Sequence, residues 1–147
     1  MSRRLAECIP QGGGDGPEAV VDALHAALNL SWRDATKICV LIVDAPPHGL
    51  DPNGDAFPNG CPCGRDPVRV VEEMAEERII LYTVGVEPSI GIVFLSLSSF
   101  SKMPYSFFIL ALYRGYYQEL SRRGRGEYIR LADANVLAQK IITDLRS

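Results

Sequence analysis

Hydrophobic residues recur along this chain with two periods that alternate. A helical spacing of Val, Leu and Ala predicts an amphipathic helix over residues 16–29. The continuous aliphatic run Ile38–Val43 then predicts a strand buried on both faces. Residues 66–78 carry the signals of a second helix, with an Asp at the N-cap and a Pro after it, and Ile79–Val84 predicts the next strand.

The C-terminal third continues the alternation. Residues 116–123 predict a helix, residues 128–131 a short strand, and the residues after Asp133 a last helix. Helices and strands in alternation predict an α/β fold, doubly wound, with a mainly parallel sheet and helices on both faces. Since only three strands are evident, fewer than such sheets normally have, we expect the sheet to be incomplete on its N-terminal side.

Two acidic residues lie at the ends of predicted helices and strands. Asp15 matches the N-cap of the first helix, with Pro17 in the first turn and Glu18 completing an Asp variant of the capping box. Asp44 directly follows the strand 38–43. Ligands of open parallel sheets bind at the carboxyl ends of the strands, so we expect Asp15 and Asp44 to converge there and to suit a hard cation such as Mg²⁺ or Ca²⁺. The alternative without a metal is that Asp15 only caps the helix and that Asp44 forms an Asx-turn.

Residues 44–67 form a long loop rich in Pro, Gly, Asp and Asn, and loops of this length inside compact domains are usually functional. His48 lies close to the expected site and has the right chemistry to tune it near neutral pH, although bonding within its own loop is the commoner role. Cys61 and Cys63 suggest a zinc or redox site. The alternative interpretation is that they stabilise the loop or are simply free thiols. Further ligands would have to come from Cys8, His25, Cys39 and His48.

The composition and the absence of certain motifs argue against several classes of function. The 147 residues are 47% hydrophobic, and 15 basic and 18 acidic residues give a net charge of −3, which argues against nucleic-acid binding through a broad basic face. The Gly-rich turn before residue 16 lacks the Lys and Ser/Thr of a phosphate-binding loop. No Ser or Cys has a base at a recognisable spacing, so the sequence gives no support for nucleophilic catalysis. The start of the chain has no signal-peptide pattern, which favours a cytoplasmic location, or an extracellular one for a fragment of a secreted protein.

The stretch Gly91–Leu112 fits neither period. It is apolar and rich in Ser and Phe, and Lys102 and Pro104 interrupt it. Its length approaches the roughly 20 apolar residues of a membrane span. An additional buried strand or helix is the simpler interpretation.

Several long motifs, in a consistent order, resemble the von Willebrand factor type A (VWA) domain. They lie at residues 12–19, 30–32, 43–49 and 55–64, and reach from the Gly-rich turn to the Cys-Pro-Cys segment. The branch that they resemble is that of VWA-containing alpha-kinases and hemicentin-like proteins, and residues 82–88 and 116–142 are similar to the later elements of that branch.

The resemblance implies a Rossmann-like fold with a metal-ion-dependent adhesion site (MIDAS) at the top of the sheet. By position, Asp44 matches the last of the family's three ligand loops, and Asp15 falls about where the family has a Thr. Gly12, Gly13, Gly14 and His48 would support the metal loops. The first ligand loop is absent, together with the first strand and helix, so the resemblance implies a degenerate site that holds a cation weakly. Mg²⁺ is the expected cation, with Ca²⁺ or Mn²⁺ as alternatives.

The domain organisation implied is an N-terminal tail over residues 1–11 and a partial VWA domain over 12–147, with an atypical apolar insertion at about 91–112. We hypothesise a truncated or mis-spliced gene product, or one piece of a larger protein. The function implied is a non-enzymatic, adhesion-type module that binds a protein ligand through an acidic side chain, with no nucleic-acid or membrane partner. The alternatives are a non-catalytic fragment of an alpha-kinase polypeptide and a membrane-tethered fragment.

Overall fold

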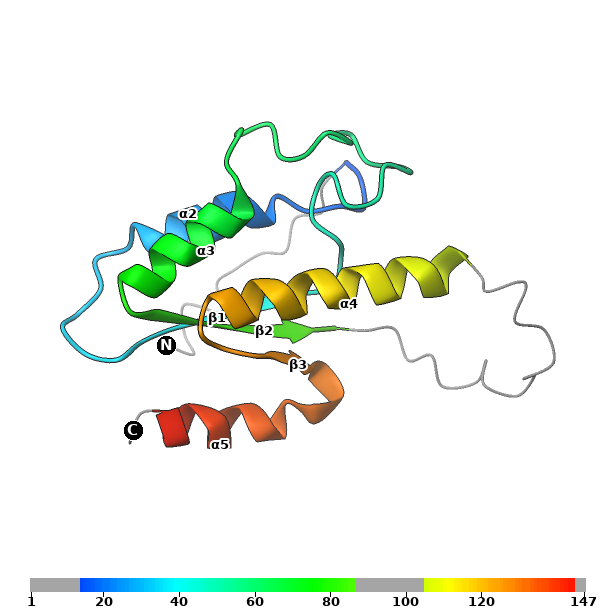
Figure 1. Cartoon of the computed structure of the whole chain (residues 1–147). Coiled ribbons are helices and arrows are strands. Elements are labelled where there is room, and N and C mark those ends of the chain that lie inside the picture. The colour runs from blue at the N-terminus through cyan, green and yellow to red at the C-terminus, as the bar shows by residue number, and fades with distance from the viewer. Residues whose placement is uncertain (1–13, 87–104, 145–147) are drawn as a thin grey trace.

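The computed structural model describes residues 14–86 and 105–144, with side chains described over 110–143 in the second range. Helices and strands alternate along the chain (Figure 1). In order, they are α2 (Val20–Leu28), β1 (Lys37–Val43), α3 (Pro67–Glu76), β2 (Ile79–Gly85), α4 (Tyr105–Arg123), β3 (Tyr128–Arg130), a 3₁₀ helix (Leu131–Asp133) and α5 (Asn135–Asp144).

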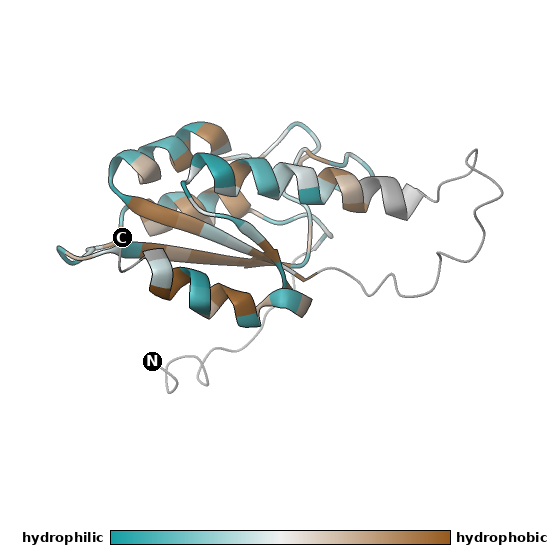
Figure 2. Ribbon diagram, turned by 60° about the horizontal axis from the view of Figure 1, so that its bottom comes forward, coloured by the Kyte–Doolittle hydropathy of each residue, from teal (hydrophilic) through white to brown (hydrophobic). Residues whose placement is uncertain are grey.

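The strands form a three-stranded parallel sheet in the order β1-β2-β3. Val43 of β1 pairs with Gly85 of β2, and Gly85 pairs with Arg130 of β3, so the carboxyl ends of the strands lie at one edge. Helices α2, α3 and α4 lie on one face of the sheet and α5 on the other, as Figure 1 and Figure 2 show. This arrangement confirms the predicted α/β fold with a parallel sheet and helices on both faces.

Successive side chains of β2 point to opposite faces of the sheet. Tyr82 faces α5, where it lines a shallow pocket with Val136. Thr83 faces α4, and its Oγ1 accepts a 2.7 Å hydrogen bond from Ser121 Oγ. Both of these residues are fully buried, so the bond satisfies polar groups that would otherwise be costly inside the protein. The apolar core around them is formed by Val20, Val21, Leu24, Val43, Val70, Val71, Met74, Ile79, Leu81, Tyr113, Tyr117 and Leu120.

Strand β1 is not buried on both faces, contrary to the prediction. Val40 is 39% exposed and Ile42 is 67% exposed, whereas Leu41 and Val43 pack against the core. Within the described residues no strand pairs with the outer edge of β1, which therefore lies at the border of the sheet. An aliphatic run looks the same in a central strand and in a border strand with one open face, so the sequence alone could not separate the two.

The start of the first helix also differs from the prediction. Helix α2 begins at Val20 rather than at residue 16, and its N-cap residue, Ala19, contributes no side-chain hydrogen bond. The reason is a parallel bridge between Glu18 and Pro47, which uses the backbone N–H and carbonyl of Glu18. Because Glu18 is held in this bridge, the helix begins only after it. Asp15 is therefore not an N-cap.

The second helix start is as predicted. Asp66 is the N-cap of α3, its side chain accepts a 2.9 Å hydrogen bond from the backbone N–H of Val68, and Pro67 occupies the first turn. Here no distant segment competes for the backbone groups of the cap, so the local signal decides the outcome.

The turn between α4 and β3 runs close beside β2. The backbone N–H of Leu81 donates to the carbonyl of Gly124 at 2.9 Å, and that of Thr83 donates to the carbonyl of Glu127 at 3.0 Å. A Cβ added to Gly126 would lie 2.0 Å from the carbonyl oxygen of Leu81, so this approach requires glycine.

The apolar stretch 91–112 divides into two parts. Residues 91–104 lie outside the described residues, so neither the expected extra element nor the membrane-span alternative is tested there. Residues 105–112 belong to α4, which begins well before the predicted residue 116. Among the described helices, none combines the length and the apolar character that crossing a membrane requires.

Candidate functional site

The loop after β1 lies beside the Gly-rich segment that precedes α2. The backbone N–H of Glu18 donates to the carbonyl of Pro46 at 2.9 Å, and the N–H of His48 donates to the carbonyl of Glu18 at 3.2 Å. Asp44 follows Val43 directly and is exposed to solvent. The structure thus brings the segment that carries Asp15 to the loop that begins with Asp44, at the carboxyl end of β1.

Asp15 is directed towards the far part of the same loop. Its Oδ2 accepts a 2.9 Å hydrogen bond from the backbone N–H of Ala56 and lies 3.8 Å from Nδ1 of His48. The Asp15 side chain is 18% exposed. It therefore joins the Gly-rich segment to residues 48–56, a role that the capping pattern did not suggest.

The buried side chain of Asp55 accepts hydrogen bonds from several residues of this loop. Its side chain has no exposed surface, and it accepts three 2.7 Å hydrogen bonds: from Nδ1 of His48 and from the backbone N–H groups of Gly49 and Phe57. Burial alone would raise the pKa of Asp55, but the bonds from Gly49, Phe57 and His48 hold it below the usual value. The ring of Phe57 meets the ring of His48 edge-on at 4.9 Å.

Asp15, His48 and Asp55 bring three possible ligand atoms within 4.8 Å of one another. This group differs from the predicted pair, because it contains Asp15 but not Asp44. Since the carboxylate oxygens of Asp55 already accept three hydrogen bonds, a cation there would have to displace part of the loop's own structure. His48 is bound within its own loop, the commoner of the two roles considered for it. Of the supporting glycines, Gly14 is exposed, and Gly12 and Gly13 lie outside the described residues.

Two buried tyrosines of α4 hold the backbone around Asp44. The hydroxyl of Tyr113 donates to the carbonyl of Val43 at 2.8 Å, and the hydroxyl of Tyr117 donates to the carbonyl of Ala45 at 3.1 Å. Burial raises the pKa of Tyr117 above its usual value. Sequence reasoning missed both residues, because nothing local in α4 reveals a contact some 70 positions away.

A second group lies where the loop meets α2. Asp22, Cys61 and Cys63 also bring three ligand atoms within 4.8 Å. The thiol of Cys61 is 3.5 Å from Oδ2 of Asp22, and Nη1 of Arg65 is 3.2 Å from Oδ1 of the same carboxylate. Burial, followed by the hydrogen bond with Cys63, raises the pKa of Cys61 to about 11. The sequence identified the cysteine pair but not Asp22. Of the further ligands considered, Cys39 lies in β1 and His48 is bonded to Asp55.

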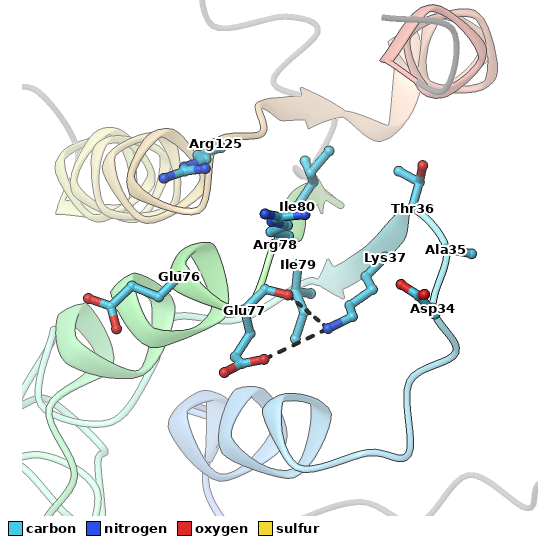
Figure 3. A pocket seen from close by; sticks show the side chains of 10 residues that line it. All are labelled: Asp34, Ala35, Thr36, Lys37, Glu76, Glu77, Arg78, Ile79, Ile80 and Arg125. Carbon is cyan, nitrogen blue, oxygen red and sulfur yellow. Dashed lines mark hydrogen bonds and ion pairs between the residues drawn. The ribbon is translucent and has the colours of Figure 1, made fainter.

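A further pocket opens at the opposite edge of the sheet (Figure 3). It has a volume of about 590 Å³ and includes Asp34, Lys37 and Arg125 in its lining. Lys37 Nζ donates to the backbone carbonyl of Glu77 at 2.9 Å and lies 3.8 Å from the Glu77 carboxylate. This pocket is at the amino ends of β1 and β2, away from the edge where open parallel sheets bind their ligands, and we assign it no function.

Comparison with known proteins gives one partial similarity. The chain is 35% identical over 65 residues to the alpha-protein kinase vwkA of Dictyostelium discoideum, a match that covers 42% of this chain and 10% of that protein. The chain thus spans about a tenth of the length of this relative. No family model matches the chain. No solved structure matches it.

Proposed function

We propose that the chain is a non-enzymatic protein-interaction module of the VWA type, with a divalent cation at the carboxyl end of β1. The observation that best supports this proposal is the bridge between Glu18 and Pro47. It joins the Gly-rich segment that carries Asp15 to the loop that begins with Asp44, as the motif resemblance requires. The similarity of part of the chain to an alpha-protein kinase agrees with the branch of the family proposed.

In this proposal Asp44 and Asp15 hold the cation, which is Mg²⁺, with Ca²⁺ or Mn²⁺ as alternatives. Both side chains offer carboxylate oxygens, the donors that hard cations prefer. Oδ2 of Asp15 is bonded to the N–H of Ala56, so Oδ1 is the oxygen left for a cation. Because only two carboxylates come from the chain, water and an acidic side chain of a protein partner would complete the coordination. The cation alone would therefore bind weakly.

The test is calorimetric titration of Mg²⁺, Mn²⁺ and Ca²⁺ into the purified chain. We expect an affinity no tighter than about millimolar, as for weak extracellular cation modules. Asp44→Ala should abolish the binding without changing the circular dichroism spectrum. Asp34→Ala is the matched control, because Asp34 is an exposed carboxylate at the other end of β1. Binding that survives Asp44→Ala, or that Asp34→Ala weakens equally, would refute the proposal.

A second candidate rests on the similarity to the Dictyostelium kinase. In this alternative the chain is a non-catalytic part of an alpha-kinase polypeptide. Sequencing the transcript distinguishes the two, since an mRNA that continues into kinase-coding sequence favours the second candidate. The same experiment tests the truncation hypothesis, which requires an mRNA that supplies the missing first ligand loop and omits codons 91–112. Under either candidate the purified chain transfers no phosphoryl group from ATP, so phosphoryl transfer by this chain alone would contradict both.

A further inference from the structure

The group formed by Asp22, Cys61 and Cys63 differs in chemistry from the site proposed above. Two of its three ligand atoms are thiol sulfurs, and both cysteines are free and half-buried. Asp22 belongs to α2, and the cysteines belong to the loop that leads into α3. Thiolates favour soft or borderline cations such as Zn²⁺, whereas a pair of carboxylates favours Mg²⁺ or Ca²⁺.

We propose that Asp22, Cys61 and Cys63 bind one Zn²⁺ ion, with a water molecule in the fourth position. Zinc accepts Cys sulfur at about 2.3 Å and carboxylate oxygen at about 2.0–2.2 Å, in a tetrahedral arrangement. Those lengths separate a sulfur and an oxygen ligand by roughly 3.5 Å and two sulfurs by roughly 3.8 Å.

The observed spacing is close to these values. Cys61 Sγ is 3.5 Å from Asp22 Oδ2, and all three ligand atoms lie within 4.8 Å of one another. A tetrahedral site therefore requires the ligands to contract by about an ångström at most.

The surrounding residues orient the ligands. The carbonyl of Cys61 accepts a 3.1 Å hydrogen bond from the N–H of Gly64, which closes a turn and returns Cys63 to the side of Cys61. Gly64 has a φ of 68°, a conformation that favours glycine. Arg65 bonds Oδ1 of Asp22 and leaves Oδ2 directed at the thiol. The positive charge of Arg65 opposes a cation at this position.

Access to the site is open on one side. Cys61 and Gly64 line a groove of about 480 Å³ that Arg65, Asp66 and Tyr116 also line. A water molecule or an exogenous ligand can therefore approach the thiol of Cys61 from this groove. Because zinc would join α2 to a loop 39 residues further along the chain, its binding should also stabilise the fold.

The test uses the full chain, kept reduced, and Co²⁺ as a spectroscopic substitute for Zn²⁺. We expect one Co²⁺ per chain with a cobalt–thiolate charge-transfer band and tetrahedral visible bands, all lost when one equivalent of Zn²⁺ is added. Cys61→Ala and Cys63→Ala should each weaken Zn²⁺ binding by more than the 10–100-fold that loss of an outer hydrogen-bond partner typically costs. Asp22→Asn should weaken binding while the cobalt–thiolate band persists.

Cys39→Ala is the matched control, because it removes one thiol from β1 and leaves the group of three intact. Circular dichroism of each variant without metal separates loss of binding from loss of folding. The proposal is overturned if Co²⁺ gives no thiolate band, if Cys39→Ala removes the band, or if the band survives both Cys61→Ala and Cys63→Ala. Since Asp44→Ala leaves these three ligands in place, its effect on Mg²⁺ binding is independent of the zinc result.

Discussion

The hydroxyl of Tyr113 donates a 2.8 Å hydrogen bond to the carbonyl of Val43, the residue directly before Asp44. The same oxygen accepts a 2.7 Å bond from the backbone N–H of Val86, so three distant segments meet at one atom. Tyr117, one turn further along α4, holds the carbonyl of Ala45. The backbone on both sides of Asp44 is therefore fixed by a helix that is remote in the sequence.

Replacing Tyr113 by Phe tests this attachment. Tyr113→Phe removes one buried hydrogen bond, which typically contributes about 0.5–1.5 kcal/mol to the free energy of unfolding. We expect a loss of that size in urea denaturation, with weaker Mn²⁺ binding if Asp44 is a ligand. Tyr116→Phe is the control, because Tyr116 contacts Tyr117 through its ring and its hydroxyl is not part of the described attachment. Equal losses in the two variants would contradict the assignment.

The buried Asp55 predicts an acid-dependent loss of stability. Its pKa in the folded protein lies below the usual value of 3.8, so ionised Asp55 stabilises the fold above pH 3.8. This stabilisation is lost as the pH falls through the lower, folded pKa. Urea midpoints of the wild type and Asp55→Asn should differ strongly at pH 7 and converge below the folded pKa. The control Asp34→Asn, at an exposed position, should have the urea midpoint of the wild type at every pH. If the difference between the wild type and Asp55→Asn persists at low pH, ionised Asp55 does not have this stabilising role.

Two glycines should respond in opposite directions to substitution by alanine. Gly126→Ala places a Cβ against the carbonyl of Leu81, an overlap that we expect to cost about 1–3 kcal/mol or more of unfolding free energy. Gly115 lies in α4 with no atom within 4 Å of an added Cβ. Gly115→Ala should therefore raise stability by about 0.5–1 kcal/mol. Thermal denaturation of both variants measures the contrast, and a neutral Gly126→Ala would show that the turn lies further from β2.

The two faces of the sheet give another contrast. Leu81 has no exposed surface, so Leu81→Ala should cost about 2–5 kcal/mol by leaving a cavity in the core. Ile42 is 67% exposed, and Ile42→Ala should change the unfolding free energy by about 0.5 kcal/mol at most. Urea denaturation of the two variants checks the prediction. A large loss in Ile42→Ala would mean that another part of the protein covers β1.

Much of the fold could be predicted from the sequence, because each element carries a local signal. The aliphatic runs of β1 and β2 and the Asp66 cap of α3 appear where the pattern placed them. The capping pattern at Asp15 failed because the backbone of Glu18 bonds to residues 46–48, which are adjacent only after folding. Local signals cannot anticipate such competition from a distant segment.

The candidate site was less accessible to prediction. The sequence indicated the two loops that the Glu18–Pro47 bridge joins, and the metal role of Asp44 and Asp15 stays a prediction. The network centred on Asp55 could not be foreseen, because an Asp in a Pro- and Gly-rich loop is ordinarily solvated. Asp22 was missed because it looks like a surface residue of an amphipathic helix until the loop with Cys61 folds against it.

The buried bond between Ser121 and Thr83 determines how α4 can sit on β2. If the helix moved by a single turn, about 5.4 Å, the hydroxyls of Ser121 and Thr83 would be left in the core without their hydrogen-bond partners. Tyr117 and Tyr113 lie four and eight positions before Ser121, on the same side of α4. The hydrogen bond between the two hydroxyls therefore fixes the position of α4 along β2. The placement of both tyrosines at the carboxyl edge of the sheet depends on this bond.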